Sequence, residues 1–192
     1  MDKDGHLKLT DFGLSKLLVT DADQTHTFCG SPEYLAPEVL IGQGHGQSVD
    51  FWCLGILLFE MMTGMPPFYS ENQSIMYQNI MKGKLHCPSY FSPRLVSLLN
   101  ALLERDVTKR LGTKGGAKEV MQHSWFADID WAKLVKKEVE PIFKPFVGTG
   151  SFDVANFDSE FTEEQPVDSF APAGELDMKV QSFTFQGESM MG

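Results

Sequence analysis

Cysteine is scarce in this chain of 192 residues, and long apolar runs are missing. The three cysteines, at positions 29, 53 and 87, are odd in number and lack the spacing of a metal site, which argues against a disulfide framework. We therefore expect a reducing compartment, the cytoplasm, with the nucleus as a second location. The longest apolar stretch, residues 51–62, contains Glu60 and is shorter than the roughly 20 residues of a membrane-spanning helix. The sequence accordingly predicts no membrane span and no signal peptide.

Basic residues are almost missing from the last quarter of the sequence. Residues 148–192 hold nine acidic residues and one basic residue, whereas the whole chain has a net charge of −10. A chain with no cationic patch has little attraction for nucleic acid or anionic lipid, so we expect no nucleic-acid partner. Glycine, proline and isolated phenylalanines punctuate this acidic segment. It is therefore predicted to be an extended tail whose phenylalanines dock on a folded surface.

Hydrophobic periodicity predicts a mainly helical body for the rest of the chain. A helix that Ser48 caps and Gly64 ends is apolar nearly all round, so we expect it to be buried on every side. Ser92 and Pro93 form a cap and first-turn pair before leucines at i, i+3, i+4, i+7 and i+8. These leucines are Leu95, Leu98, Leu99, Leu102 and Leu103. Weaker helical patterns cover residues 73–82 and 117–123.

The first residues predict a short β hairpin. Asp4 and Gly5 have the composition of a tight turn, and Leu7 and Leu9 alternate with polar residues as in a strand. Residues 15–31 show no sustained period and are predicted to form a loop.

An ordered set of motifs gives the chain a resemblance to a known family. The motifs are Asp11-Phe12-Gly13, Thr27-Phe28-Cys29-Gly30-Ser31-Pro32-Glu33-Tyr34, Ala36-Pro37-Glu38, Asp50-Phe51-Trp52-Cys53-Leu54-Gly55, Pro66-Pro67-Phe68 and Lys109-Arg110-Leu111-Gly112. In this order they resemble the eukaryotic protein kinases. Three tail elements, Pro141–Pro145, Phe157–Thr162 and Phe183-Thr184-Phe185, are similar to those of the AGC group of serine/threonine kinases. Residues 5–16 and 166–169 look closest to the ribosomal-protein kinases.

This resemblance implies a fold and a domain organisation. Residues 1–126 would be part of a kinase domain, namely the activation segment and the lower helices of the large lobe. Residues 127–192 would be the regulatory tail of an AGC kinase. A kinase also needs a glycine-rich loop, a strand lysine with its helix glutamate, and a catalytic loop, and none of these fits within residues 1–10. We therefore expect a fragment without the amino-terminal lobe and without catalytic-loop residues.

The cofactors implied by the resemblance are ATP and Mg²⁺. Asp11 would be the Mg²⁺ ligand, because this cation prefers carboxylate oxygen at a rigid position. Phe157 would belong to the tail segment that closes over the adenine. One carboxylate by itself binds Mg²⁺ poorly, so we expect this fragment to hold both cofactors weakly.

Three residues match phosphorylation sites of AGC kinases: Thr27 in the activation loop, and Ser169 and Thr184 in the tail. A phosphate on Thr27 would need cationic partners, and Lys16 matches one of them. The expected activator is an upstream kinase of the phosphoinositide-dependent type, which the phenylalanines around Thr184 would recruit. Phe170 stands where a proline is expected after Ser169, which counts against a proline-directed site there.

The remaining matches concern substrate binding and structure. Phe28, Pro32 and Leu35 would line an apolar pocket for the residue after the phosphoacceptor, and the Ser31 hydroxyl would help to position the substrate. Glu60 would read a substrate arginine, so that the protein substrates carry basic residues near the serine or threonine; the alternative is a solvated charge at a helix end. Glu38 and Arg110 would form a buried salt bridge, and Asp50 would cap the backbone of the catalytic loop.

Three hypotheses about function follow. The chain is a fragment of a kinase that transfers the ATP γ-phosphoryl group to serine or threonine, and it is inactive by itself. Alternatively, it is a non-catalytic interaction module or decoy that binds an upstream kinase through its tail. The third hypothesis is that it has no function, because a helix as apolar as residues 51–62 aggregates when its neighbours are missing.

Overall fold

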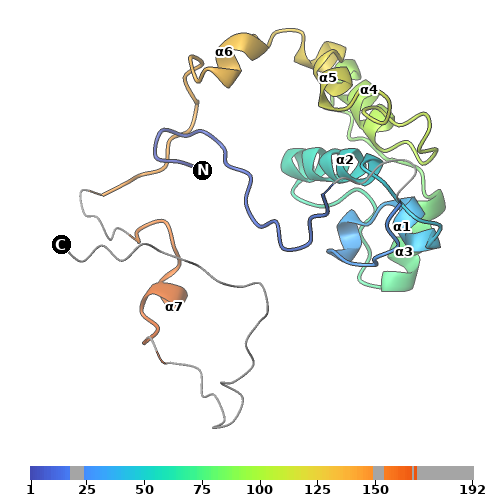
Figure 1. Ribbon diagram of the computed structural model, residues 1–192, viewed down its shortest axis with the longest axis horizontal. Coiled ribbons are helices and arrows are strands. Elements are labelled where there is room, and N and C mark those ends of the chain that lie inside the picture. The colour runs from blue at the N-terminus through green and yellow to red at the C-terminus, as the bar shows by residue number, and fades with distance from the viewer. Residues whose placement is uncertain (18–23, 149–153, 166, 168–192) are drawn as a thin grey trace. The chain divides into compact units, whose positions relative to one another are not determined.

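The computed structural model describes residues 1–17, 24–148, 154–165 and 167 (Figure 1). The chain divides into two units. One unit is the helical body, Lys8–Glu140. The other combines Met1–Leu7 with the described residues of Pro141–Gly192. Each unit is described by itself below.

Short helices make up the body. They are η1 (Pro32–Tyr34), α1 (Pro37–Ile41), α2 (Ser48–Thr63), α3 (Gln73–Lys82), α4 (Pro93–Leu102), α5 (Ala117–Met121), η2 (Ser124–Phe126) and α6 (Trp131–Val135). The expected mainly helical fold is confirmed for the described residues. The pattern at 117–123 ends two residues earlier than predicted, at Met121.

The helix ends show which sequence signals were read correctly. The Ser92 side chain accepts a hydrogen bond from the Leu95 backbone N–H at 3.2 Å, which confirms the predicted cap of α4. Gly64 ends α2 in the left-handed conformation (φ 83°), as is typical of a C-terminal glycine. The predicted cap at Ser48 was wrong: Ser48 is the first helical residue of α2, and its hydroxyl donates to Glu38 at 3.5 Å instead.

The core lies where α2 packs against α4 and η1, and where α1 packs against α3. Gly55 lets α2 and α4 approach closely, because a Cβ at this position would lie 2.9 Å from the Leu103 side chain. Trp52 is fully buried, and its ring stacks on that of Phe68 with 5.9 Å between centroids. The five leucines of the α4 pattern are all buried: Leu95, Leu98, Leu99, Leu102 and Leu103.

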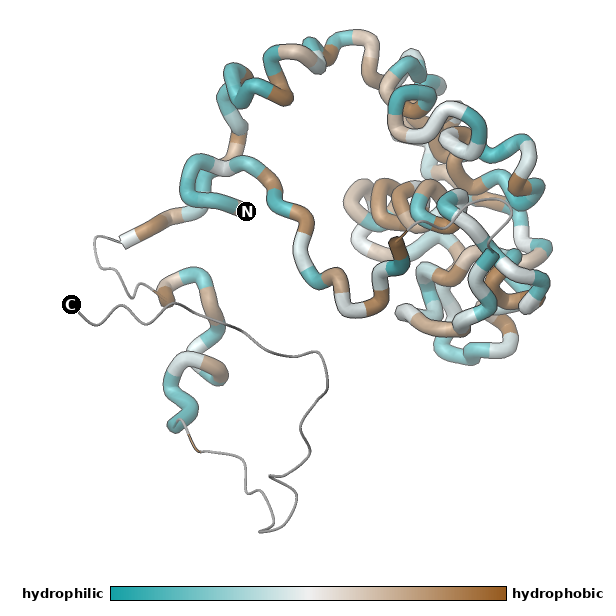
Figure 2. The backbone as a smooth tube through the Cα atoms, viewed as in Figure 1, coloured by the Kyte–Doolittle hydropathy of each residue, from teal (hydrophilic) through white to brown (hydrophobic). Residues whose placement is uncertain are grey.

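One face of α2 is open, which corrects the expectation that this helix is buried on every side. Figure 2 shows hydrophobic residues along most of its length. Trp52 and Ile56 are fully buried, but Leu54, Leu57 and Met61 are 39%, 42% and 66% exposed. The physical reason is that α4 and η1 cover only part of the circumference. The all-round apolar pattern is therefore typical of a helix with more packing partners than the described residues provide for α2.

The expected β hairpin is not present in the part of the chain that the structure describes. Asp2 and Gly5 do form the turn, with the Gly5 N–H donating to the Asp2 carbonyl at 3.0 Å. Leu7 and Leu9 form no ladder and are 82% and 84% exposed. The alternating pattern favours a strand only when a neighbouring strand takes up its backbone hydrogen bonds.

The second unit contains the short helix α7 (Ser159–Thr162). The Asp158 side chain caps it by accepting a hydrogen bond from the Glu160 backbone N–H at 3.0 Å. Gly5 is buried against Pro141 and Phe143, and a Cβ on it would lie 2.4 Å from the Phe143 carbonyl oxygen. Across both units, none of the helices in the described ranges is long and apolar enough to cross a membrane.

Candidate substrate-binding and regulatory site

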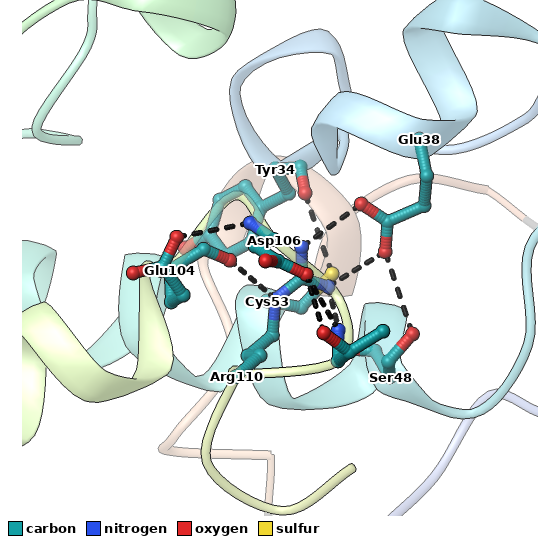
Figure 3. A network of polar contacts seen from close by, with 8 residues as sticks. Tyr34, Glu38, Ser48, Cys53, Glu104, Asp106 and Arg110 are labelled. Atoms are coloured by element: carbon teal, nitrogen blue, oxygen red, sulfur yellow. Dashed lines mark hydrogen bonds and ion pairs between the residues drawn. The ribbon is translucent and has the colours of Figure 1, made fainter.

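A buried ion pair joins two segments that are far apart in the sequence. The Arg110 guanidinium donates two hydrogen bonds to the Glu38 carboxylate, from Nη1 to Oε1 at 2.6 Å and from Nη2 to Oε2 at 2.9 Å (Figure 3). Arg110 is 1% exposed and Glu38 is 9% exposed. This geometry is the bidentate fork that gives arginine–carboxylate pairs their strength. The structure thus brings together the two residues that were predicted to form a buried salt bridge.

Further contacts of Arg110 engage two more of its five N–H donors. Nη1 also donates to the Ser48 carbonyl oxygen at 3.0 Å, and Nε donates to the Glu104 carbonyl oxygen at 2.8 Å. The guanidinium lies over the ring of Trp52, 5.2 Å from its centroid. A buried charge is tolerated only when its donors are paired, and here both polar and aromatic partners meet that need. Arg110 therefore ties α1, the start of α2 and the turn after α4 together.

The Lys16 ammonium binds two threonine hydroxyls of the expected activation loop. It donates to Thr27 Oγ1 at 3.0 Å and also to Thr25 Oγ1. The two hydroxyl oxygens lie 3.4 Å apart. Both Lys16 and Thr27 are exposed to solvent. The structure thus places the expected phosphorylation site beside its expected cationic partner. Ser169 and Thr184 lie outside the described residues.

The segment after Thr27 divides its side chains between the surface and the core. Phe28 is 59% exposed and lines a cavity of about 680 Å³ between α1 and α3, together with Leu40 and Tyr77. Leu35 is 5% exposed and packs in the core with Trp52. Phe28 and Leu35 therefore do not line a common cavity among the described residues. Their role in binding the substrate stays a prediction, as does that of Ser31 and Pro32.

Glu60 has a specific partner, which favours a site over a solvated charge. Its carboxylate accepts a hydrogen bond from the Tyr34 hydroxyl, and this bond raises the pKa of Tyr34 to about 12. Tyr34 therefore stays protonated and holds the carboxylate in place. Both residues line a cavity of about 360 Å³ together with Ser31, Glu33 and Tyr69. Two carboxylates thus line the same cavity as the serine that was predicted to position the substrate.

Below this segment, a cysteine thiol fixes the backbone of Tyr34. Cys53 Sγ on α2 lies 3.3 Å from the Tyr34 carbonyl oxygen. Burial raises the pKa of the Cys53 thiol to about 11, so that it keeps its proton and can donate this weak hydrogen bond. Tyr34 is therefore linked to α2 at two points, through Cys53 and through Glu60.

The described residues by themselves do not fit a complete Mg²⁺ and ATP site. Asp11 is exposed in a left-handed conformation (φ 61°), and its Oδ1 accepts only a long 3.4 Å hydrogen bond from the Gly13 N–H. Within the described ranges no group of three or more histidine, cysteine, aspartate or glutamate residues could hold a metal ion. Phe157 is 69% exposed. Asp11 can supply one ligand, and the other groups of such a site are not among these residues.

Asp50 lies in the first turn of α2 and lines a cavity with Lys16 and Thr27. Partial desolvation raises the pKa of its carboxyl group. Its role as a cap of the catalytic loop stays a prediction.

Sequence reasoning missed two contributors to this region. Thr25 was predicted to be a loop residue without a role. In the structure its hydroxyl shares the Lys16 ammonium with that of Thr27, and only the fold brings Thr25 into contact with a lysine nine residues earlier. Arg105 donates to the backbone carbonyls of Ile80 at 2.7 Å and Asn79 at 3.2 Å, and so satisfies the end of α3. In the sequence, the only indication of this role was that Arg105 lies in a charged turn, five residues before Arg110.

Comparison with known proteins agrees with this geometry. The protein kinase domain model matches residues 1–126, and the protein kinase C terminal domain model matches residues 149–187. The chain therefore belongs to the protein kinase family. The pairing of this domain with that C-terminal domain, together with its relatives, places it in the AGC group of serine/threonine kinases.

The relatives are longer proteins. The chain is 54% identical over 197 residues to protein kinase 2 of Dictyostelium discoideum, and 47% identical over 195 residues to the serine/threonine-protein kinase YPK2/YKR2 of Saccharomyces cerevisiae. Both alignments cover 100% of this chain, but only 40% and 28% of the relative. The serine/threonine-protein kinase gad8 of Schizosaccharomyces pombe is 50% identical over 181 residues, which is 94% of this chain and 32% of that protein. The chain thus spans well under half the length of these relatives.

The buried ion pair generates a stability prediction. Replacing Glu38 with Gln, or Arg110 with Met, leaves one charge buried without its partner, and each change should lower the free energy of unfolding by about 3–5 kcal/mol. The double variant Glu38→Gln/Arg110→Met should lose clearly less than the sum, because no uncompensated charge remains.

Urea unfolding of the single and double variants, followed by far-UV circular dichroism, measures this coupling. Lys109→Met serves as a control, because Lys109 is exposed and paired with Asp106 on the surface. Additive losses in the double variant would show that the ion pair does not couple the two segments.

Proposed function

We propose that this chain is the substrate-binding and regulatory part of a serine/threonine protein kinase whose complete form phosphorylates proteins that carry basic residues. The observation that carries the proposal is the cavity in which Glu33 and Glu60 lie beside Ser31. Membership of the AGC group supports the reaction type, and the acidic cavity supports the substrate class.

The carboxylate of Glu60 is suited to a substrate arginine. A guanidinium offers two parallel N–H donors that match the two oxygens of a carboxylate. The Tyr34 hydroxyl already occupies one lone pair of Glu60 and restrains the side chain, so that less rotamer entropy is lost on binding. Glu33 adds a second negative charge to the same cavity. An arginine side chain of a substrate peptide would therefore find both matching geometry and opposite charge in this cavity.

ATP and Mg²⁺ are used by the protein kinase family, and they are the expected cofactors of the complete kinase. In this chain Asp11 would contribute one Mg²⁺ ligand, and Phe157 would contact the adenine. The rate of phosphoryl transfer depends on positioning and on neutralising charge around the phosphates. One exposed carboxylate does little of either.

Substrate recognition can be tested in the full-length kinase. Glu60→Gln should lower kcat/KM by about 10–100-fold for a peptide with arginine near its serine, because the charge-assisted pair contributes roughly 1.5–3 kcal/mol. The same variant should barely change kcat/KM for the matched peptide with alanine in place of arginine. Steady-state kinetics with both peptides measure the difference. Glu138→Gln serves as a control, because Glu138 is exposed and lies after the end of α6. An equal loss for both peptides would mean that Glu60 acts through the fold.

Activity of the 192-residue chain by itself is a second test. Purified chain, incubated with radiolabelled ATP, Mg²⁺ and a basic peptide, should show no transfer above background. Clear turnover that Asp11→Asn abolishes would contradict this expectation, whereas turnover that survives Asp11→Asn would point to a contaminating kinase.

A second candidate function is an interaction module that competes with intact relatives. The match of residues 149–187 to the protein kinase C terminal domain favours it, since these residues include Phe183, Thr184 and Phe185. An upstream kinase of the phosphoinositide-dependent type would bind this motif and phosphorylate Thr27, while Thr184 and Ser169 would be further phosphorylation sites.

A pull-down with the purified upstream kinase tests the module. The parent chain should retain the kinase, and Phe183→Ala should reduce its recovery several-fold, because an aromatic anchor carries a large share of such an interface. Phe152→Ala is a control for the loss of a tail phenylalanine elsewhere. Equal recovery of the upstream kinase with all three chains would contradict this second candidate function.

A further inference from the structure

An arginine inside the helical body shows which groups of this chain accommodate a guanidinium. The Glu38 carboxylate accepts two hydrogen bonds from Arg110, at 2.6 and 2.9 Å, and the guanidinium lies over the Trp52 ring, 5.2 Å from its centroid. Arg105 repeats the second contact, 5.4 Å from the centroid of the Phe68 ring. A guanidinium can have both partners at once, because its N–H donors lie in its plane and leave its face for a ring.

The acidic cavity at the end of α2 has the same two kinds of group. Its volume is about 360 Å³, and its lining includes the carboxylates of Glu33 and Glu60 and the side chain of Tyr69. Tyr69 is 44% exposed, so its ring is accessible to a ligand. No lysine, arginine or histidine is among the described residues that line this cavity. A cation that pairs with these groups therefore comes from another molecule.

The sequence after α2 fixes the place of Tyr69. Pro66 and Pro67 restrict two consecutive φ angles, and the Tyr69 N–H donates to the Pro66 carbonyl oxygen at 3.4 Å. Phe68 is 3% exposed, and its ring stacks on Trp52 in the core. The core thus anchors one residue of this turn, and the next residue, Tyr69, lies at the surface in the cavity lining. A side chain on a restrained turn loses less conformational freedom when it binds a ligand.

We propose that the Tyr69 ring stacks on the guanidinium of a substrate arginine held by Glu60, and that this ring makes the kinase prefer arginine to lysine. The inference rests on the proposed function, in which Glu60 binds a basic residue of the protein substrate. The guanidinium is planar, so it directs its donors toward the carboxylate and its face toward the ring. Tyr69 is then a specificity-determining residue of the substrate site.

Lysine fits the same cavity less well. Its ammonium is compact and strongly hydrated, and its three donors point in different directions, so contact with the ring displaces more bound water and leaves fewer donors for the carboxylate. Glu33 and Glu60 attract either cation through their charge. The two carboxylates therefore give the preference for basic residues, and the ring gives the choice between arginine and lysine.

The preference can be measured with the full-length kinase and three peptides that carry arginine, lysine or alanine at one position. Tyr69→Leu should lower kcat/KM for the arginine peptide by about three- to tenfold, which is the contribution of a cation–π contact at a partly exposed site. The loss should lie in KM with kcat unchanged, because the ring binds the substrate and the transition state equally. The same variant should lower kcat/KM for the lysine peptide by less than about twofold.

Two control variants separate the ring from the fold. Tyr69→Phe keeps the ring and removes only the hydroxyl, so it should retain the arginine preference of the parent kinase. Tyr90→Leu removes a tyrosine that is 68% exposed and does not line this cavity, and it should leave kcat/KM unchanged for all three peptides. Equal losses for the arginine and lysine peptides in Tyr69→Leu, or a Tyr69→Phe variant as impaired as Tyr69→Leu, would overturn the proposal.

Proton NMR of the bound arginine peptide gives a readout that does not depend on turnover. The ring current of Tyr69 should shift the δ-methylene protons of the arginine upfield in complexes with the parent kinase and with Tyr69→Phe. The shift should be lost with Tyr69→Leu. A shift of the same size in all three complexes would show that another ring, such as that of Tyr34, makes the contact, and the role of Tyr69 would be wrong.

Failure of this inference differs from failure of the proposed function. If the parent kinase uses the arginine and alanine peptides equally well, this cavity does not select a basic residue, and both the proposed function and the role of Tyr69 are wrong. If arginine and lysine are both preferred to alanine and Tyr69→Leu keeps the ratio between them, the proposed function stands and only the role of Tyr69 is wrong.

Discussion

The ion pair between Glu38 and Arg110 is the interaction on which the arrangement of the helical body depends. It joins residues 72 positions apart, and the same guanidinium also holds the backbone of Ser48 and Glu104. Its cost in desolvation is offset only because every contact is made in good geometry. The pair therefore fixes the start of α1 against the start of α2 and the turn after α4.

From this anchor, both functional regions extend outward. Toward one side, η1 and the thiol of Cys53 position Tyr34, which restrains Glu60 in an acidic cavity. Toward the other, the loop after α1 carries His45 to the strand-like pair with Thr25. The candidate substrate cavity and the bridge at His45 thus involve segments on either side of α1 in the chain.

The open face of α2 differs from the environment that the composition of this helix predicts. A helix with Leu54, Leu57 and Met61 exposed retains the composition of a fully buried element. The alignments with longer kinases agree, since this chain covers only 28–40% of the three relatives compared. Asp11 is likewise an exposed carboxylate, and no further metal-ligating cluster accompanies it among the described residues.

The sequence by itself determined the family, the helices at 48–63, 73–82 and 93–102, the cap at Ser92 and the pairing of Glu38 with Arg110. These features depend on local periodicity, on caps, and on motifs whose order is readable along the chain. Only the tertiary structure decided that the Ser48 hydroxyl bonds Glu38, that Leu35 is in the core, and that the predicted hairpin strand has no partner strand among the described residues. It also decided that Thr25, Thr27, Lys16 and His45 meet around one cavity. Hydrogen bonds, burial and charge interactions between distant segments depend on distances in space, and residue types along a chain do not contain those distances.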